Sequence, residues 1–364
     1  MNGLLQDLHS KKPWHRDMRG VLYLLIGATL IAGLGYTALS TSSTVQDLVF
    51  KQGAKRLLSQ PQAQFDGMRV IVCGSASPLG NSMDRAQACI AVLTPEHLFI
   101  FDAGARSPTR INQARLPLDR ITGVFLTHFH SDHITGLADV NLQSWVRGRP
   151  AELKIFGPPG VEQVVNGYNT AFSLDRAYRT AHHGTDMFPP ETGAMQPVTF
   201  QPGGVIWEDE LATITSFHVD HPPIEPSVGY RVDYKGRSVV ISGDSNATDS
   251  LFNAAKDADL LLHDGLSESL ITPMQTMAEE LNVARLPKIM EDVKEYHAEV
   301  HTLPERSKAA GIKQLALYHL VPVPANFLAA DIFSRGLPDD VVITEDLHTF
   351  DLPANSDEIL IYEP

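Results

Sequence analysis

The chain contains the segment Val124-Phe-Leu-Thr-His128-Phe-His130-Ser-Asp132-His133, in which an apolar run is followed at once by four potential metal ligands. Alternate side chains of a strand point to the same side, so His128 and His130 can bind one ion together. Asp132 and His133 follow where the chain turns and can reach a second ion. Imidazole and carboxylate ligands suit zinc, manganese or iron. Packing alone does not explain four such groups, because each buried polar side chain needs its own partner. The segment therefore predicts a metal site.

The motif His128-x-His130-x-Asp132-His133 resembles the signature of the metallo-β-lactamase superfamily. Further landmarks of this resemblance follow one another from about Met68 to Pro353: Gly74-Ser-Ala-Ser-Pro, Phe101-Asp-Ala-Gly, Gly157-Pro-Pro-Gly, Gly229-Tyr-Arg, Ser242-Gly-Asp-Ser and Leu317-Tyr-His-Leu-Val-Pro. The branch that these landmarks resemble contains ribonuclease Z, the tRNA 3′-processing endonuclease, and related arylsulfatase-like and phosphodiesterase-like hydrolases. The resemblance implies an α/β (α+β) fold, namely a four-layer αββα sandwich, and a homodimer as one form of the protein.

The resemblance also implies the remaining ligands, position by position. His221, which precedes Gly229-Tyr-Arg, matches the third histidine of the first metal, with His218 as a rival three residues earlier. Asp244 matches the carboxylate that bridges both metals, and His319 matches the last ligand of the second. The implied sets are His128, His130 and His221 for the first ion, Asp132, His133 and His319 for the second, and Asp244 for both.

Two neighbouring divalent ions, zinc with manganese or iron as alternatives, would activate a water as the nucleophile at neutral pH. Asp132 would orient that nucleophile as well as bind metal. In ribonuclease Z-like enzymes a histidine before the last ligand protonates the leaving group, supported by an acidic residue. The matching positions are His297 and Asp264, although Asp264 replaces the usual Glu and Ala298-Glu299 replaces small hydroxylated residues. His301 is kept as a second candidate for the proton donor.

Composition and charge describe a globular and acidic protein. Hydrophobic residues make up 43% of the 364 residues and charged residues 20%, which fits a chain with a substantial core. The net charge of −14 makes the surface as a whole a poor attractor for nucleic-acid phosphates. A nucleic-acid substrate is therefore disfavoured but still open, because a local basic patch can exist within an acidic protein.

The N-terminus carries an apolar run, Val21–Leu39, whose helical length approaches the ~30 Å hydrocarbon thickness of a bilayer. Basic residues precede the run, which would keep the N-terminus cytoplasmic: Lys11, Lys12, Arg16 and Arg19. We expect a basic segment at 1–20, a transmembrane signal anchor at 21–39, a linker at 40–65 and a hydrolase domain at 66–364. This predicts a bacterial inner-membrane protein with its catalytic domain on the periplasmic side. A cleaved signal peptide ending near Ala38-Leu39-Ser40 is the alternative.

The chain has two cysteines, Cys73 and Cys89, each in or beside a predicted strand. A disulfide between adjacent strands and a pair of buried free thiols are both compatible with this placement.

Short runs rich in apolar and β-branched residues alternate with Gly, Pro, Asp and Asn, which is typical of strands and turns. The expected strands are Met68–Cys73, Cys89–Leu93, Leu98–Asp102, Gly123–Thr127, Leu153–Phe156, Ala212–His218, Val228–Tyr234, Ser238–Ser242, Leu260–His263, Gln314–Tyr318 and Val341–Thr344. The expected helices are Gly160–Thr170, Ser250–Asp257, Thr276–Tyr296 and Leu303–Ala310. The segment Thr170–Pro202 is expected to be irregular, and its Arg176, Arg179, His182 and His183 could meet an anionic substrate or belong to a solvated face.

These observations predict a hydrolase of small phosphodiesters or sulfate esters, anchored in a membrane. A tRNA 3′ endonuclease like ribonuclease Z ranks second, because an exported domain would meet no tRNA precursor and no arm rich in Lys and Arg is evident. Acyl hydrolysis, as in a lactonase or β-lactamase, is a further alternative. An inactive membrane-anchored binding protein is the last, and the complete ligand set speaks against it.

Overall fold

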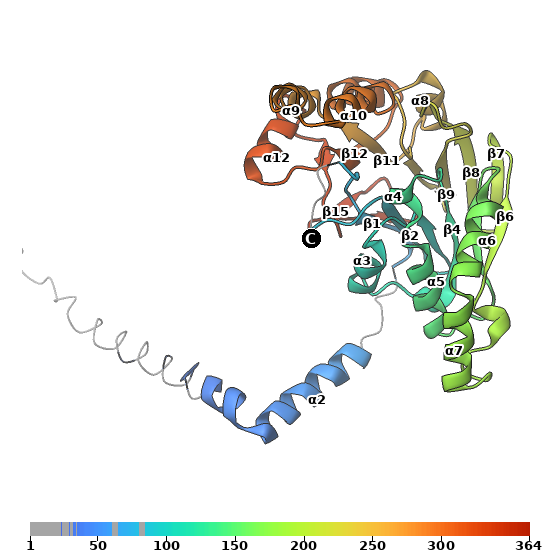
Figure 1. The fold of residues 1–364 in the computed structure, drawn as a ribbon, viewed down its shortest axis with the longest axis vertical. Helices are drawn as coiled ribbons and strands as arrows, with labels where there is room; N and C mark the ends of the chain where they lie inside the picture. Colours follow the sequence, from blue (N-terminus) through green and yellow to red (C-terminus); the bar gives the residue numbers. More distant parts are fainter. Residues whose placement is uncertain (1–22, 24–28, 30–31, 34, 60–64, 80–83) are drawn as a thin grey trace, which may run out of the picture. The chain divides into compact units, whose positions relative to one another are not determined.

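The computed structural model describes residues 23, 29, 32–33, 35–59, 65–79 and 84–364 (Figure 1). The chain divides into two units, Met1–Ala63 and Gln64–Pro364. The first contains α2 (Ser43–Ser59), a helix in the segment that was expected to be a linker. The second unit contains both β-sheets and all the predicted site residues.

Among the described residues, one sheet has eight strands in the spatial order β15-β14-β1-β2-β3-β4-β5-β6. Its strands are β1 (Gly67–Gly74), β2 (Cys89–Leu93), β3 (Leu98–Phe101), β4 (Ile121–Phe125), β5 (Leu153–Gly157), β6 (Met195–Thr199), β14 (Thr349–Pro353) and β15 (Leu360–Tyr362). The central strands β2 and β3 are buried along nearly their whole length, as expected of strands covered on both faces.

The second sheet has seven strands among the described residues, in the order β13-β12-β11-β10-β9-β8-β7. They are β7 (Gly204–Glu208), β8 (Ala212–His218), β9 (Val228–Tyr234), β10 (Arg237–Ile241), β11 (Leu260–Leu266), β12 (Gln314–Val321) and β13 (Val342–Ile343). β10, β11, β12 and β13 run parallel to one another, and β8 and β10 are both antiparallel to β9. The carboxyl ends of β8, β10, β11 and β12 therefore lie at one edge of this sheet.

The two sheets pack face to face, and the main hydrophobic core lies between them. Phe125 from the first sheet and Tyr230 from the second meet there with ring centroids 6.0 Å apart. A second core lies on the outer face of the first sheet, under α3 (Ser107–Gln113), α5 (Leu137–Val146) and α6 (Val161–Ala171). A third covers the outer face of the second sheet, under α8 (Asp249–Ala254), α11 (Leu303–Ala309) and α12 (Phe327–Ser334). The layers are thus helix, sheet, sheet, helix (Figure 1), as predicted.

The second unit also contains the helices α4 (Ser131–Ile134), α7 (Ser173–His183), α9 (Glu268–Glu280) and α10 (Leu286–Asp292), with 3-10 turns at Leu118–Arg120, Pro190–Thr192, Val293–Glu295 and Val300–Thr302. The expected helix Thr276–Tyr296 is divided into α9, α10 and a 3-10 turn. The expected irregular segment Thr170–Pro202 instead contains α7 and β6.

Cys73 of β1 and Cys89 of β2 form a disulfide, with Cα atoms 4.9 Å apart. The antiparallel pairing of the two strands sets Gly74 opposite Cys89, which brings the neighbouring Cys73 within reach. Of the two alternatives that the sequence left open, the structure therefore has the disulfide.

The localisation prediction needs correction. Within the described part of the chain, no helix combines the length and the apolar character needed to cross a bilayer. About half of the expected anchor at Val21–Leu39 lies outside the described residues. α2, the described helix that follows it, carries Asp47, Lys51 and Lys55 at helical intervals and is not apolar. The predicted inner-membrane protein with a periplasmic catalytic domain is wrong on this finding.

Candidate active site

The predicted site residues come from strand ends of both sheets. His128, His130, Asp132 and His133 follow β4 of the first sheet, and the last two lie in the single turn of α4. The second sheet supplies three more from the ends of β8, β10 and β12: His221, Asp244 and His319. The fold thus gathers seven predicted ligands from distant parts of the sequence.

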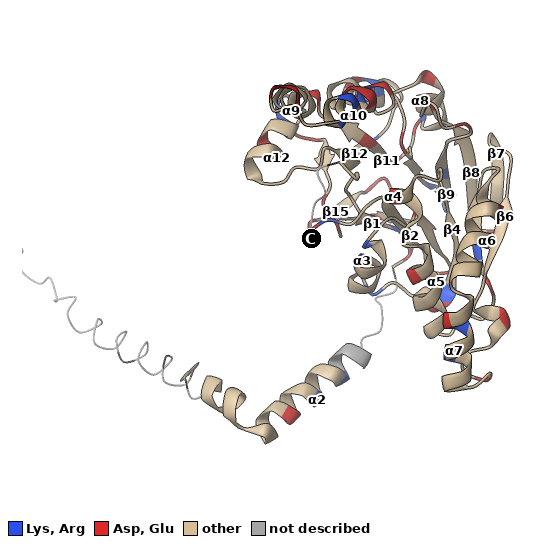
Figure 2. Cartoon of the chain, in the orientation of Figure 1, with Lys and Arg blue, Asp and Glu red and all other residues tan. Residues whose placement is uncertain are grey.

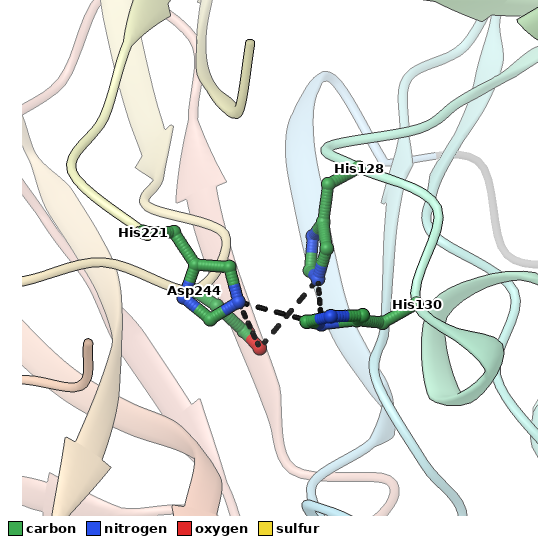
Figure 3. Close-up of side chains that lie close together, drawn as sticks. All are labelled: His128, His130, His221 and Asp244. Carbon is green, nitrogen blue, oxygen red and sulfur yellow. Dashed lines mark hydrogen bonds and ion pairs between the residues drawn. The ribbon is translucent and has the colours of Figure 1, made fainter. Parts of the chain in front are cut away.

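A first cluster consists of His128, His130, His221 and Asp244 (Figure 3). His128 Nε2 lies 2.9 Å from His130 Nδ1, and His221 Nε2 lies 3.4 Å from the same atom. Asp244 Oδ2 is 3.9 Å from His128 Nε2 and 4.0 Å from His221 Nε2. Three imidazole nitrogens and one carboxylate oxygen therefore converge on one point, as in a tetrahedral metal site.

A second cluster consists of Asp132, His133, Asp244 and His319. His133 Nε2 lies 3.2 Å from Asp244 Oδ2 and 3.5 Å from Asp132 Oδ2. His319 Nε2 lies 3.1 Å from Asp132 Oδ2 and 3.4 Å from Asp244 Oδ2. Asp244 Oδ2 belongs to both clusters, so this carboxylate has the position of a bridge between two ions.

The backbone at His319 has an unusual conformation that serves the second cluster. In the β11–β12 pairing Asp264 is opposite Tyr318 and Gly265 is opposite Leu320, so His319 is the extra residue of a β-bulge. Its φ of 44° is left-handed, which is uncommon for a residue other than glycine. A bulge re-aims a side chain out of the regular alternation of a strand, and here it accompanies the contact of His319 with Asp132.

An outer layer of hydrogen bonds orients the imidazoles. Asp102 Oδ2 accepts a hydrogen bond from His133 Nδ1 at 2.8 Å, which leaves the Nε2 lone pair for the second cluster. Thr127 donates its backbone N–H and its hydroxyl to the same carboxylate. His221 Nδ1 donates to the carbonyl oxygen of Tyr296 at 3.0 Å. Asp102 was not among the predicted site residues, although its place at the end of an apolar strand was a usable signal.

The protonation states fit cation binding. Burial lowers the pKa of His128, His130 and His221, so these imidazoles are neutral at neutral pH and offer their lone pairs. Burial acts to raise the pKa of Asp132, but the facing His133 and His319 lower it to about 2. Burial also acts to lower the pKa of His133, yet Asp244 and Asp102 raise it well above its usual value. The second cluster therefore holds protons that a cation would displace.

Another observation fits a pair of ions. Asp244 Oδ1 is buried without a hydrogen-bond partner among the described residues. An unpaired buried carboxylate oxygen is costly, and cations beside the carboxylate would offset that cost. The donor set of nitrogen and oxygen atoms thus fits two divalent cations, without fixing which metal they are.

A family model described as "Beta-lactamase superfamily domain" matches residues 97–319. The chain belongs to the metallo-β-lactamase superfamily. Ribonuclease Z of Mycobacterium bovis is 31% identical over 258 residues, covering 70% of this chain and 86% of that protein. Ribonuclease Z of Mycolicibacterium gilvum is 32% identical over 293 residues, covering 77% of this chain and 95% of that protein.

Solved structures agree on the superfamily fold. The short form of human tRNase Z matches with a TM-score of 0.54 and 20% identity, covering 78% of this chain and 99% of that one. The metallo-β-lactamase fold protein YhfI of Bacillus subtilis matches with a TM-score of 0.56 and 18% identity, covering 79% of this chain and 100% of that one. Identities this low show the fold alone.

Beside the two clusters of this superfamily member lies the predicted proton-donating pair. His297 Nδ1 is 2.7 Å from Asp264 Oδ2, and both side chains are buried. Asp264 also accepts a hydrogen bond from the backbone N–H of Ser245 and contacts His263. His297 lines a cavity of about 340 Å³ together with residues of both clusters, including Asp132 and Asp244.

The rival residues lie elsewhere. His218 is exposed at the end of β8 and belongs to neither cluster. His301 is bonded to Glu299 and to the carbonyl oxygen of Arg335, and it lines a different cavity. The four basic residues of α7 do not line the cavity of the two clusters: Arg176, Arg179, His182 and His183. Arg179 is paired with Asp175 on its own helix.

Proposed function

We propose that this protein is a metal-dependent phosphodiesterase that cleaves RNA, as a 3′-processing endonuclease of the ribonuclease Z type. The observation that carries the proposal is the pair of clusters that share Asp244, with His297 and Asp264 at the side of the same cavity. RNA is proposed as the substrate because relatives matched over most of their length are called ribonuclease Z.

In this proposal the first and second clusters hold two ions, which we take to be zinc. When bound, such ions supply a hydroxide nucleophile and neutralise charge on the phosphate. Asp132 is ionised at neutral pH and lies in the second cluster, which shares Asp244 with the first. In this proposal it orients the attacking water. The Nδ1–H of His297 donates a hydrogen bond to Asp264 Oδ2, so that a proton on Nε2 is free to pass to the departing oxygen. Asp264 is thus a positioning residue that fixes the ring and its tautomer.

Phosphodiesters fit this arrangement better than sulfate esters of small phenols. A ribose hydroxyl is a poor leaving group that needs a proton, and in this proposal the buried His297, held by Asp264, donates it. A nitrophenolate needs no such donor. The comparisons with known proteins support neither arylsulfatase activity nor a membrane partner.

The test uses the full chain loaded with zinc and a tRNA precursor that carries a 3′ extension, with bis(p-nitrophenyl) phosphate and p-nitrophenyl sulfate in parallel. We expect chelator-sensitive cleavage of the precursor and of the phosphodiester. Asp132→Ala should abolish both activities, whereas Asp119→Ala, which changes an exposed aspartate outside the site, should leave them intact. A zinc-loaded protein that leaves both phosphodiesters uncut, or that prefers the sulfate, would contradict the proposal.

A further inference from the structure

One wall of the active-site cavity is apolar and has no role in the chemistry described above. It is formed by five residues, which we call the apolar wall: Leu79, Ile289, Val293, Tyr296 and Val321. Val293 and Val321 are buried in a small hydrophobic cluster, and Leu79 and Tyr296 pack against that cluster. The wall is therefore built into the fold and held by α10 and the turn that follows it.

Part of this wall remains open to solvent inside the cavity. Ile289 is 45% exposed, and Leu79 and Tyr296 are partly buried. Large apolar side chains that stay accessible inside a concave site with a few convergent polar groups are typical of ligand contacts. A site that handled only the phosphate group would have no use for them.

Tyr296 joins the apolar wall to the reacting groups. Its ring stands edge-on to His221 of the first cluster, with centroids 5.0 Å apart and an interplanar angle of 89°. It also lies 5.0 Å from the ring of His297, the proposed proton donor. A planar group that stacked on Tyr296 would therefore be a direct neighbour of the scissile phosphate.

The charged residues around the cavity indicate which further groups of the substrate can bind there. No Lys or Arg is among the described residues that line it. The charged residues of α9 are all acidic, and α10 carries Lys288 beside Glu291 and Asp292; Figure 2 shows acidic residues on α9. Near the scissile bond the described lining thus offers no cation for further phosphates, and its apolar side chains suit an uncharged aromatic group.

We propose that the apolar wall is a subsite for an unpaired nucleobase of the nucleotide next to the scissile phosphate, with Tyr296 as the stacking platform. This inference rests on the proposed function. Single-stranded RNA is commonly bound by stacking its unpaired bases on aromatic side chains, and such stacking tolerates all four bases because each has a flat face. The subsite recognises that a base is present, and which of the four bases it is has little influence.

The experiment compares uridine 5′-(p-nitrophenyl phosphate) with its abasic ribose counterpart, which has the same sugar and leaving group but no base. With the zinc-loaded full chain we expect kcat/KM to be about tenfold higher for the substrate with the base. Tyr296→Ala should bring that ratio close to one, and Ile289→Ala should lower it partly. Tyr296→Phe keeps the ring and should keep the ratio. Met277→Ala, at an exposed apolar residue of α9 outside the cavity, is the matched control and should change neither rate.

Two failures can be told apart. Chelator-sensitive turnover of both substrates at equal kcat/KM, or a ratio that Tyr296→Ala leaves unaltered, would overturn the subsite and leave the phosphodiesterase intact. Turnover of neither substrate, together with an uncut tRNA precursor, would overturn the proposed function and the subsite with it.

Discussion

Asp102→Asn tests whether the outer hydrogen-bond layer controls the second cluster. Asp102 lies at a left-handed φ of 58°, a conformation that Asn tolerates well, so the backbone should not change. The buried carboxylate accepts three hydrogen bonds, two from Thr127 and one from His133 Nδ1. An amide has only one oxygen, so at least one of these three donors must face an N–H group instead.

Both orientations of the amide have a cost. If the amide nitrogen faces the backbone N–H of Thr127, a buried hydrogen bond to a charged acceptor is lost, which costs roughly 1.5–3 kcal/mol of stability. If it faces His133, the ring must accept at Nδ1, and its proton moves to Nε2, where it points at the second cluster. Changes to such supporting groups typically lower metal affinity by about 10–100-fold. We therefore expect weaker metal binding together with a modest loss of stability.

The assay is competition for zinc against a chromophoric chelator, combined with thermal unfolding of the metal-free protein. Asp351→Asn is the matched control, because Asp351 of β14 is also buried. It accepts two hydrogen bonds of 2.6 Å from Arg69 of β1, away from the site. The substitution should cost stability without changing metal affinity. An Asp102→Asn protein that binds two zinc ions as tightly as the wild type would refute the reasoning.

Three further predictions follow from the same contacts. His297→Ala should greatly slow cleavage of a tRNA precursor and have a smaller effect on bis(p-nitrophenyl) phosphate, because nitrophenolate leaves without a proton; His301→Ala should affect neither, and equal losses on both substrates would argue against a proton donor. Replacing Cys73 and Cys89 by Ser should lower the free energy of unfolding by roughly 3 kcal/mol in the chain-entropy model, measured by denaturant titration against the oxidised wild type. On acidification the second cluster should lose its metal before the first: the raised pKa values of His133 and His319 let protons compete from a higher pH, whereas the lowered values of the first-cluster histidines delay that competition. Metal content at successive pH values checks the order, and simultaneous release would contradict it.

The strands that the sequence predicted well are those with strong patterns. β8 has Ala212, Ile214 and Ser216 buried on one face, and its predicted bounds agree with the structure. β6 was missed because it contains Pro197, which lacks the N–H that a central strand would need; β6 is in fact an edge strand, where proline is tolerated. α7 was missed because the Pro, Gly and His residues of Thr170–Pro202 suggested a loop, although α7 spaces its polar and apolar residues at helical intervals; none of them is buried.

The site was partly predictable for a similar reason. The four ligands from His128 to His133 are close in sequence and can be found by inspection, whereas the family resemblance implied the other three. The structure brings all seven together. The outer layer cannot be found this way. Asp102 and His133 are linked only because the first sheet sets β3 beside β4. Tyr296 is 75 residues from His221 in the sequence, and the fold brings its carbonyl oxygen to the His221 ring. Such contacts depend on tertiary packing, which a local pattern does not record.

This division also explains how the fold controls the chemistry. The first sheet supplies the ligands from His128 to His133, and the second supplies His221, Asp244 and His319, so neither sheet contains a complete cluster. Asp244 can bridge two ions only if the sheets keep their separation and register. That relation is set by the core between them, where rings such as Phe125 and Tyr230 pack closely and resist displacement. The hydrophobic core therefore positions the metals as directly as the ligands do.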